Sequence, residues 1–113
     1  MAAPAIDRAT LAELQETAGA DFVAELIDTF LEEAPPMLEA LREALAAGQA
    51  EPFRRAAHSL KSNASTFGAL TLASLARDLE LNGIEPARAS GALALLAEHY
   101  AAAAAELKAL RGA

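Results

Sequence analysis

The fold of this chain is decided by residues 58–69, which read HSLKSNASTFGA. In a helix that turns about 100° per residue, Leu60, Ala64 and Phe67 fall close to one line, which predicts a face buried in a core. His58 lies about 140° away from that line, so its imidazole is predicted to point into water. Three apolar residues just before the stretch continue the buried line, namely Phe53, Ala56 and Ala57.

The exposed side of this helix carries small side chains and positive charge around the histidine. Ser62 and Ser65 lie beside His58, while Arg54 and Lys61 lie about one turn to either side of it. An imidazole can be neutral and nucleophilic near neutral pH, and the flexible ammonium of a lysine can reach the oxygens of a phosphoryl group on that ring. His58 is therefore a candidate to accept a phosphoryl group, with Lys61 placed to stabilise it and with Arg54, Ser62 and Ser65 on the side from which a partner would approach. The alternative is an ordinary solvated histidine on a helix surface.

The composition of the 113-residue chain favours one helical domain and excludes several classes of function. Hydrophobic residues make up 54% of it, and many of them are alanine, the strongest helix former. The chain has no cysteine, and its two histidines are far apart in sequence, so neither a disulfide framework nor a metal site is expected. A net charge of −7 argues against binding to nucleic acid, whose phosphates require clustered Lys and Arg.

The cellular location is predicted from the same features. Residues 1–5, MAAPA, lack the basic and apolar regions of a secretory signal peptide. No apolar run approaches the roughly 20 residues that span a bilayer. We therefore expect a cytoplasmic protein that binds no membrane.

Five helices are predicted from the apolar periodicity and from the residues that begin and end helices. Asp7 can cap the first of them, and glycines follow the first four. Pro35 and Pro36 fall inside the second helix, where they predict a kink or a break; the apolar stripe continues in register past them, which favours the kink. The predicted ranges are 7–18, 21–47 with a kink near 35–36, 52–67, 70–82 and 86–110.

Four of these helices are long, and the connections between them are short, which is typical of antiparallel neighbours. The predicted fold is an all-α, antiparallel up-down-up-down four-helix bundle with a short N-terminal capping helix, in a single domain 1–113. A chain of this size has no room for a separate nucleotide-binding unit.

Phe22 lies about 90° off the centre of the apolar stripe on the second helix, with Leu26 beside it. One interpretation is that Phe22 packs beneath the first short helix. The other is that Phe22, Leu26 and Leu14 form an apolar docking patch for a partner. The sequence leaves both open.

The central motif resembles that of the histidine phosphotransfer (HPt) domain family of phosphorelays. That motif reads histidine, any residue, leucine, lysine, a small residue and, several positions on, glycine-alanine; it is matched here by His58-Ser59-Leu60-Lys61-Ser62 and Gly68-Ala69. Residues 30–35 resemble part of the family's first long helix, and residues 72–80 the segment that follows glycine-alanine. The small residue is most often glycine in the family, so Ser62 makes the approach slightly more crowded.

The resemblance implies a phosphoryl carrier with no nucleotide site or cofactor of its own, rather than an enzyme. Its histidine would accept a phosphoryl group from the aspartate of one receiver domain and pass it to another. The implied partners are response-regulator receiver domains and a hybrid sensor histidine kinase, with the receiver supplying Mg²⁺. Leu14, Phe22 and Leu26 stand where the family has docking residues, and we expect a monomer. Two alternatives remain: a bundle that docks receivers without carrying phosphate, and the phospho-accepting module of a larger histidine kinase.

Overall fold

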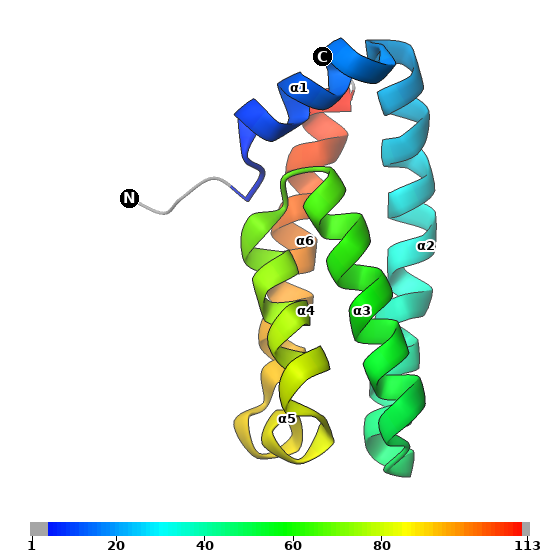
Figure 1. Cartoon of the computed structure of the whole chain (residues 1–113), viewed down its shortest axis with the longest axis vertical. Helices are drawn as coiled ribbons and strands as arrows, with labels where there is room; N and C mark the ends of the chain where they lie inside the picture. Colours follow the sequence, from blue (N-terminus) through cyan, green and yellow to red (C-terminus); the bar gives the residue numbers. More distant parts are fainter. Residues whose placement is uncertain (1–4, 112–113) are drawn as a thin grey trace.

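The structure, a computed structural model, describes residues 5–111, and these form helices joined by short connections, with no strand among them. The helices are α1 (Arg8–Ala18), α2 (Ala20–Ala47), α3 (Ala50–Thr66), α4 (Leu70–Asn82), α5 (Ile84–Ser90) and α6 (Ala92–Arg111). Figure 1 shows α2, α3, α4 and α6 running in alternating directions, with α1 lying across one end. The predicted all-α bundle is confirmed. No helix within the described range combines the length and apolarity that crossing a membrane requires.

The core lies between the four long helices, because α3 packs on α2 and α4, and α6 packs on the same two helices. On α3, Phe53, Ala57 and Leu60 are fully buried, which confirms the buried line predicted from the sequence. The ring of Phe30 on α2 lies 5.3 Å from that of Phe67 and 6.0 Å from that of Tyr100 on α6, measured between centroids. Burial of each large apolar side chain stabilises the fold by roughly 1.5–3 kcal/mol.

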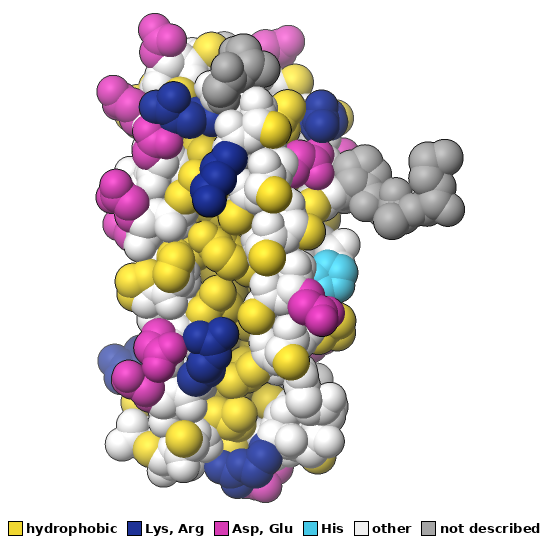
Figure 2. Space-filling view, turned by 180° about the vertical axis from the view of Figure 1, so that it is seen from behind, with side chains coloured by type: hydrophobic (Ala, Val, Ile, Leu, Met, Phe, Trp, Pro, Cys, Tyr) yellow, Lys and Arg dark blue, Asp and Glu magenta, His cyan; other side chains and the backbone are white. Residues whose placement is uncertain are grey.

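The face of the bundle that is hidden in Figure 1 exposes hydrophobic side chains. Figure 2 shows a band of hydrophobic side chains along it, between charged groups. The outer side of α6 contributes exposed alanines, which are small and each add little apolar area: Ala94, Ala101, Ala102, Ala105 and Ala109.

Helix α2 continues through Pro35 and Pro36 without a break. Each proline lacks the N–H that would bond the carbonyl four residues back, so the carbonyls of Leu31 and Glu32 have no donor within the helix. Both prolines are exposed, while Ala34 and Leu38 on the opposite side are buried in the core. Packing on both sides of the proline pair holds the two halves in one helix.

The predicted helix over 86–110 is wrong, because two helices occupy this region. α5 ends at Gly91, which has φ 67° and ψ 28°, a left-handed conformation that closes a helix and that glycine adopts without strain. The N–H of Gly91 donates to the carbonyl of Ala87. The chain starts again at Ala92, and only the second helix forms part of the bundle. α3 begins at Ala50 and α5 at Ile84, each two residues before the predicted start, which places Pro52 and Pro86 in first turns.

Helix α1 is held over the end of the bundle by the turn that follows α3. The carboxylate of Asp7 accepts a hydrogen bond from the N–H of Thr10 at 3.3 Å, so Asp7 caps α1 as predicted. The N–H of Asp7 donates to the carbonyl of Gly68 at 2.7 Å. Gly68 has φ +78°, and a Cβ atom there would lie 2.8 Å from the carbonyl oxygen of Asp7. The glycine of the motif therefore permits the close contact on which α1 rests.

Two ion pairs attach α6 to neighbouring elements. Nε of Arg8 lies 3.0 Å from Oε1 of Glu106, which ties α1 to α6. Arg111 donates to both carboxylate oxygens of Asp28 on α2 at 2.7 Å, and these hydrogen bonds hold the pKa of Asp28 below its ordinary value. Both pairs lie near the end of the bundle that α1 covers, so charge pairing supports the apolar contacts there.

Candidate functional site

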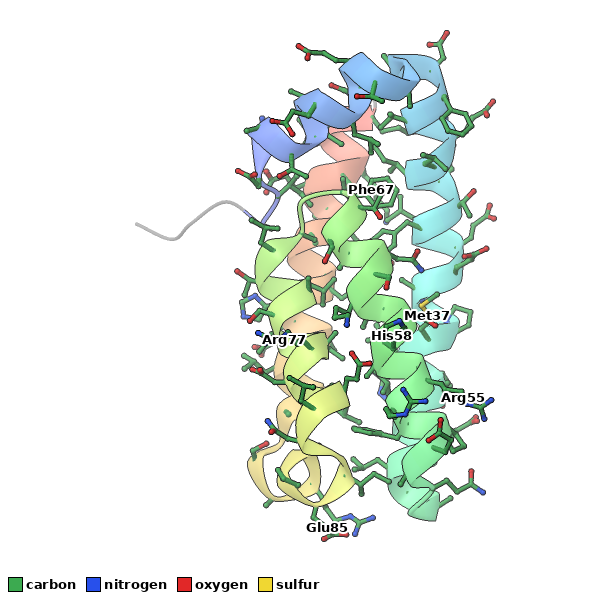
Figure 3. The ribbon with its side chains drawn as sticks, viewed as in Figure 1. Met37, Arg55, His58, Phe67, Arg77 and Glu85 are labelled. Carbon is green, nitrogen blue, oxygen red and sulfur yellow. The ribbon has the colours of Figure 1, made fainter. Side chains whose placement is uncertain are left out.

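His58 lies on the outer surface of α3, within the bundle's length rather than at its end (Figure 3). Its side chain is 54% exposed, while Ala57 and Leu60, its neighbours on the buried side, are inaccessible to solvent. Ser62 and Ser65 are both exposed on the same helix. The structure therefore places the histidine where the periodicity predicted, with small side chains beside it.

A carboxylate from the next helix holds the histidine ring. Nδ1 of His58 lies 2.7 Å from Oε2 of Glu80 on α4, and Nζ of Lys61 donates to the other oxygen, Oε1, at 2.9 Å. The Glu80 side chain is only 13% exposed, so α3 and α4 enclose most of it. The two residues predicted as nucleophile and cation are thus joined by one carboxylate.

Sequence reasoning missed Glu80, although the sequence contains a signal for it. Ala69 lies in the short connection between α3 and α4, and His58 and Glu80 stand eleven residues before and after it. In an antiparallel helix pair, residues at equal distances from the connection lie at the same level along the two helices. The equal spacing from Ala69 therefore indicates that His58 and Glu80 lie level with each other on α3 and α4.

The charge state of Glu80 decides which ring nitrogen of His58 is free. The hydrogen bond from Lys61, and with a smaller effect that from His58, lowers the pKa of Glu80, while burial acts in the opposite direction. Glu80 is therefore ionised at neutral pH and can only accept hydrogen bonds. Nδ1 must carry the hydrogen that lies between the two groups, which leaves a lone pair on Nε2 of the neutral ring.

Arg54 does not join this group. Its guanidinium binds Glu51, one turn earlier on α3, with Nε 3.2 Å from Oε2. This hydrogen bond is the main cause of the raised pKa of Arg54, and the charge of Glu80 adds a smaller contribution. Arg54 is thus a nearby cation that a local acid already neutralises.

The predicted docking residues lie on α1 and the first half of α2. Phe22 is 52% exposed, so the interpretation in which it packs beneath α1 is wrong. Leu14 and Leu26 are half-buried against the core. Leu26 also lines a small hollow of about 110 Å³ between α2 and α3, together with Asn63 and Thr66. The docking role of Leu14, Phe22 and Leu26 stays a prediction.

Comparison with known proteins agrees with this fold. Residues 25–113 match the family model of the Hpt domain. The chain is also similar to the histidine-containing phosphotransfer protein B (HptB) from Pseudomonas aeruginosa PAO1, whose crystal structure superimposes with a TM-score of 0.89 at 34% sequence identity. That match covers 98% of this chain and 97% of the other. Among curated proteins, none matches the chain.

The chain therefore belongs to the Hpt domain family. It is a histidine phosphotransfer protein of the phosphorelay type, and the resemblance drawn from the motif is confirmed. Members of this family are phosphocarriers rather than enzymes with a complete catalytic site of their own.

Proposed function

We propose that His58 carries the phosphoryl group, receiving it from the aspartate of one receiver domain and passing it to the aspartate of another. The observation that supports this most strongly is the hydrogen bond of 2.7 Å between Nδ1 of His58 and Glu80, with the ring itself exposed. A histidine oriented in this way presents a nucleophilic Nε2 to an incoming protein. The neighbouring serines, Ser62 and Ser65, are small enough to leave the approach open.

The transfer step needs no separate base. The lone pair on Nε2 attacks the phosphorus of an aspartyl phosphate, and the N–P bond forms as the bond from phosphorus to the aspartate oxygen breaks. The electron pair leaves with the aspartate carboxylate. Because Nε2 holds no hydrogen in this tautomer, no proton has to be removed. Onward transfer is the reverse reaction with a second receiver.

Glu80 acts as a positioning residue. It keeps the hydrogen on Nδ1 before transfer, and its negative charge stabilises the positive charge that the ring acquires once Nε2 is phosphorylated. Its own lowered pKa keeps it ionised throughout the neutral range.

Lys61 supplies the positive charge for the phosphoryl oxygens. Nζ of Lys61 lies 2.9 Å from Glu80, and the same carboxylate binds the ring of His58. The ammonium is therefore close to the ring, and rotation about the bonds of the flexible lysine side chain can bring it to the phosphoryl oxygens. Stabilising charge in this way is the main contribution that a protein makes to phosphoryl transfer.

The partners complete the chemistry. We propose receiver domains as donor and acceptor, with a hybrid sensor histidine kinase upstream, and we assign Mg²⁺ to the acidic pocket of the receiver. We further propose that the protein works as a cytoplasmic monomer, and that Leu14, Phe22 and Leu26 contact the receiver. An exposed Phe22 supports this docking role.

A phosphotransfer profile tests this function. Each receiver domain of the source cell is phosphorylated, mixed with the protein, and sampled at early times. We expect rapid transfer from a small subset of receivers to the wild type and none to His58→Gln. Equal labelling of the wild type and His58→Gln would overturn the proposal.

A further inference from the structure

The end of α4 places an asparagine directly before a glycine. Asn82 is the last residue of the helix and is exposed, and Gly83 separates it from α5. Figure 1 shows this junction near the end of the bundle opposite α1. Because Gly83 has no Cβ atom, nothing on that residue hinders the approach of its main-chain nitrogen to the side-chain carbonyl carbon of Asn82. A bond between these two atoms closes a five-membered ring.

Within residues 5–111, one hydrogen bond holds the peptide group that must turn before this ring can close. The N–H of Gly83 donates to the carbonyl of Leu79 at 3.0 Å. In a continuous helix the carbonyl of Asn82 would accept from residue 86, but that residue is Pro86, which has no N–H. In the same range neither this carbonyl nor the Asn82 side chain forms a hydrogen bond. Since helices fray at their ends, the opening of a single bond frees the group.

The other asparagine of the chain, Asn63, is held more firmly. It lies inside α3 and is half-buried, and its amide Nδ2 lies 3.8 Å from Sδ of Met37 on α2. The residue that follows it is Ala64, which is fully buried. Ring closure there would require the helix to open within the core. The two asparagines therefore provide a comparison within one molecule.

We infer that Asn82 is a site of spontaneous deamidation. The nitrogen of Gly83 loses its proton to hydroxide and bonds to Cγ of Asn82, while the bond from Cγ to Nδ2 breaks and the amide leaves as ammonia with a proton from water. Water then opens the resulting succinimide. Cleavage of the new bond from nitrogen to Cγ gives aspartate, and cleavage of the original peptide bond gives isoaspartate, whose main chain runs through the side chain. In both products a carboxylate replaces the amide, which adds one negative charge.

Deamidation weakens the turn of α4 that carries Glu80. A carboxylate at position 82 lies at the negative end of the helix dipole and four residues after Asp78, so both repel it. Isoaspartate also lengthens the main chain by one carbon, which the helix cannot accommodate in register. We expect the contact of Glu80 with the His58 ring to loosen and phosphotransfer to slow by about threefold. This effect on transfer rests on the proposed function, whereas the modification itself does not.

Peptide mapping by mass spectrometry tests the modification. The folded protein is warmed at mildly alkaline pH and digested in acid, where the ring does not form. We expect aspartate and isoaspartate to accumulate at position 82, faster at higher pH, while Asn63 keeps its amide. Asn82→Gln is the matched variant, because its longer side chain would have to close a six-membered ring, and it should stay unmodified. An Asn82 that persists, or equal loss of amide at Asn63, would overturn the inference.

The effect on transfer is measured separately, with the phosphorylated receiver domain that transfers fastest to the wild type. Asn82→Asp should transfer about threefold more slowly than the wild type. Aged wild type should lose activity in proportion to its modified fraction, and aged Asn82→Gln should keep the rate of fresh protein. Circular dichroism checks that each sample remains helical. Equal rates for all samples would refute the link to Glu80, while peptide mapping still decides the modification. If no receiver labels the fresh wild type, the proposed function itself fails.

Discussion

Nδ1 of His58 on α3 lies 2.7 Å from Oε2 of Glu80 on α4, so a residue from the next helix fixes the orientation and the tautomer of the ring. This relationship connects the fold to the chemistry. The short turn between α3 and α4 brings the two residues to the same level. The lowered pKa of Glu80 keeps its carboxylate ionised, so it accepts a hydrogen bond from the N–H at Nδ1. Nε2 is then the nitrogen available for phosphoryl transfer.

Replacement of Glu80 by Gln should weaken the hydrogen bond that fixes the orientation and the tautomer of the His58 ring. A neutral amide loses the charge-assisted hydrogen bond to Nδ1, so we expect transfer to slow by about tenfold. Nitrogen NMR of the imidazole should show a larger share of the tautomer with the hydrogen on Nε2. Glu51→Gln, which removes an acid from α3 that binds Arg54, is the matched control and should leave the tautomer unchanged. An unaltered tautomer ratio in Glu80→Gln would show that Glu80 does not position the ring.

The stability of the protein should depend on pH through Glu80. Its pKa is below the ordinary value of 4.5 in the folded protein, mainly because of Lys61. At a pH above the pKa that the carboxyl has in the unfolded chain, the ionised group stabilises the fold. That contribution is lost as the pH falls through the lower pKa that the group has in the folded protein. In urea unfolding between pH 7 and pH 3, the wild type should lose stability more steeply than Glu80→Gln. Asp28 and Glu51 also have lowered pKa values, but both residues are present in the two proteins, so their contributions cancel in the comparison. If the free energy of unfolding falls equally in both proteins between pH 7 and pH 3, Glu80 does not stabilise the fold in this way.

Lys61→Ala should separate chemistry from folding. Without the ammonium the phosphoryl oxygens lose their nearest cation, and we expect transfer to slow by about tenfold. The free energy of unfolding should fall by about 1 kcal/mol or less, as for a partly exposed ion pair, and the helicity should be retained. Lys61→Arg, which keeps the charge, should recover part of the rate. Loss of helicity in step with transfer would indicate a structural role instead.

Gly68→Ala should destabilise the protein more than Gly48→Ala does. Both glycines have positive φ, which costs an alanine about 1 kcal/mol. Only at Gly68 would the new Cβ also lie 2.8 Å from the carbonyl of Asp7, whereas nothing lies within 4 Å at Gly48. We expect a loss of about 2 kcal/mol or more at Gly68 against about 1 kcal/mol at Gly48, measured by urea unfolding. Equal losses would mean that the contact with α1 adds nothing.

The sequence predicted the bundle because its signals are local. The spacing of Phe53, Ala57 and Leu60 is set by one helix, and the same spacing placed His58 on the opposite side. The break at Gly91 was missed because the apolar pattern continues on both sides of it, and only the left-handed backbone ends α5.

The site was predicted in part for the same reason. His58 and Lys61 are one turn apart on one helix, so their proximity follows from sequence spacing. Glu80 comes from α4, and its contact depends on how two helices are paired, which the periodicity of either helix does not contain. Arg54 is also about one turn from His58 on the same helix, but it does not join the site. Glu51, on that helix, binds its guanidinium instead.

The central claim is that Nε2 of His58 carries the phosphoryl group, and NMR correlation of phosphorus with the imidazole nitrogens tests it most directly. The nitrogen-labelled protein is phosphorylated by its fastest receiver and measured beside His58→Gln. We predict a phosphorus coupling to Nε2 of His58, with Nδ1 still bonded to hydrogen, and no phosphohistidine in the variant. Phosphorus on Nδ1, or a phosphohistidine that persists in His58→Gln, would contradict the account.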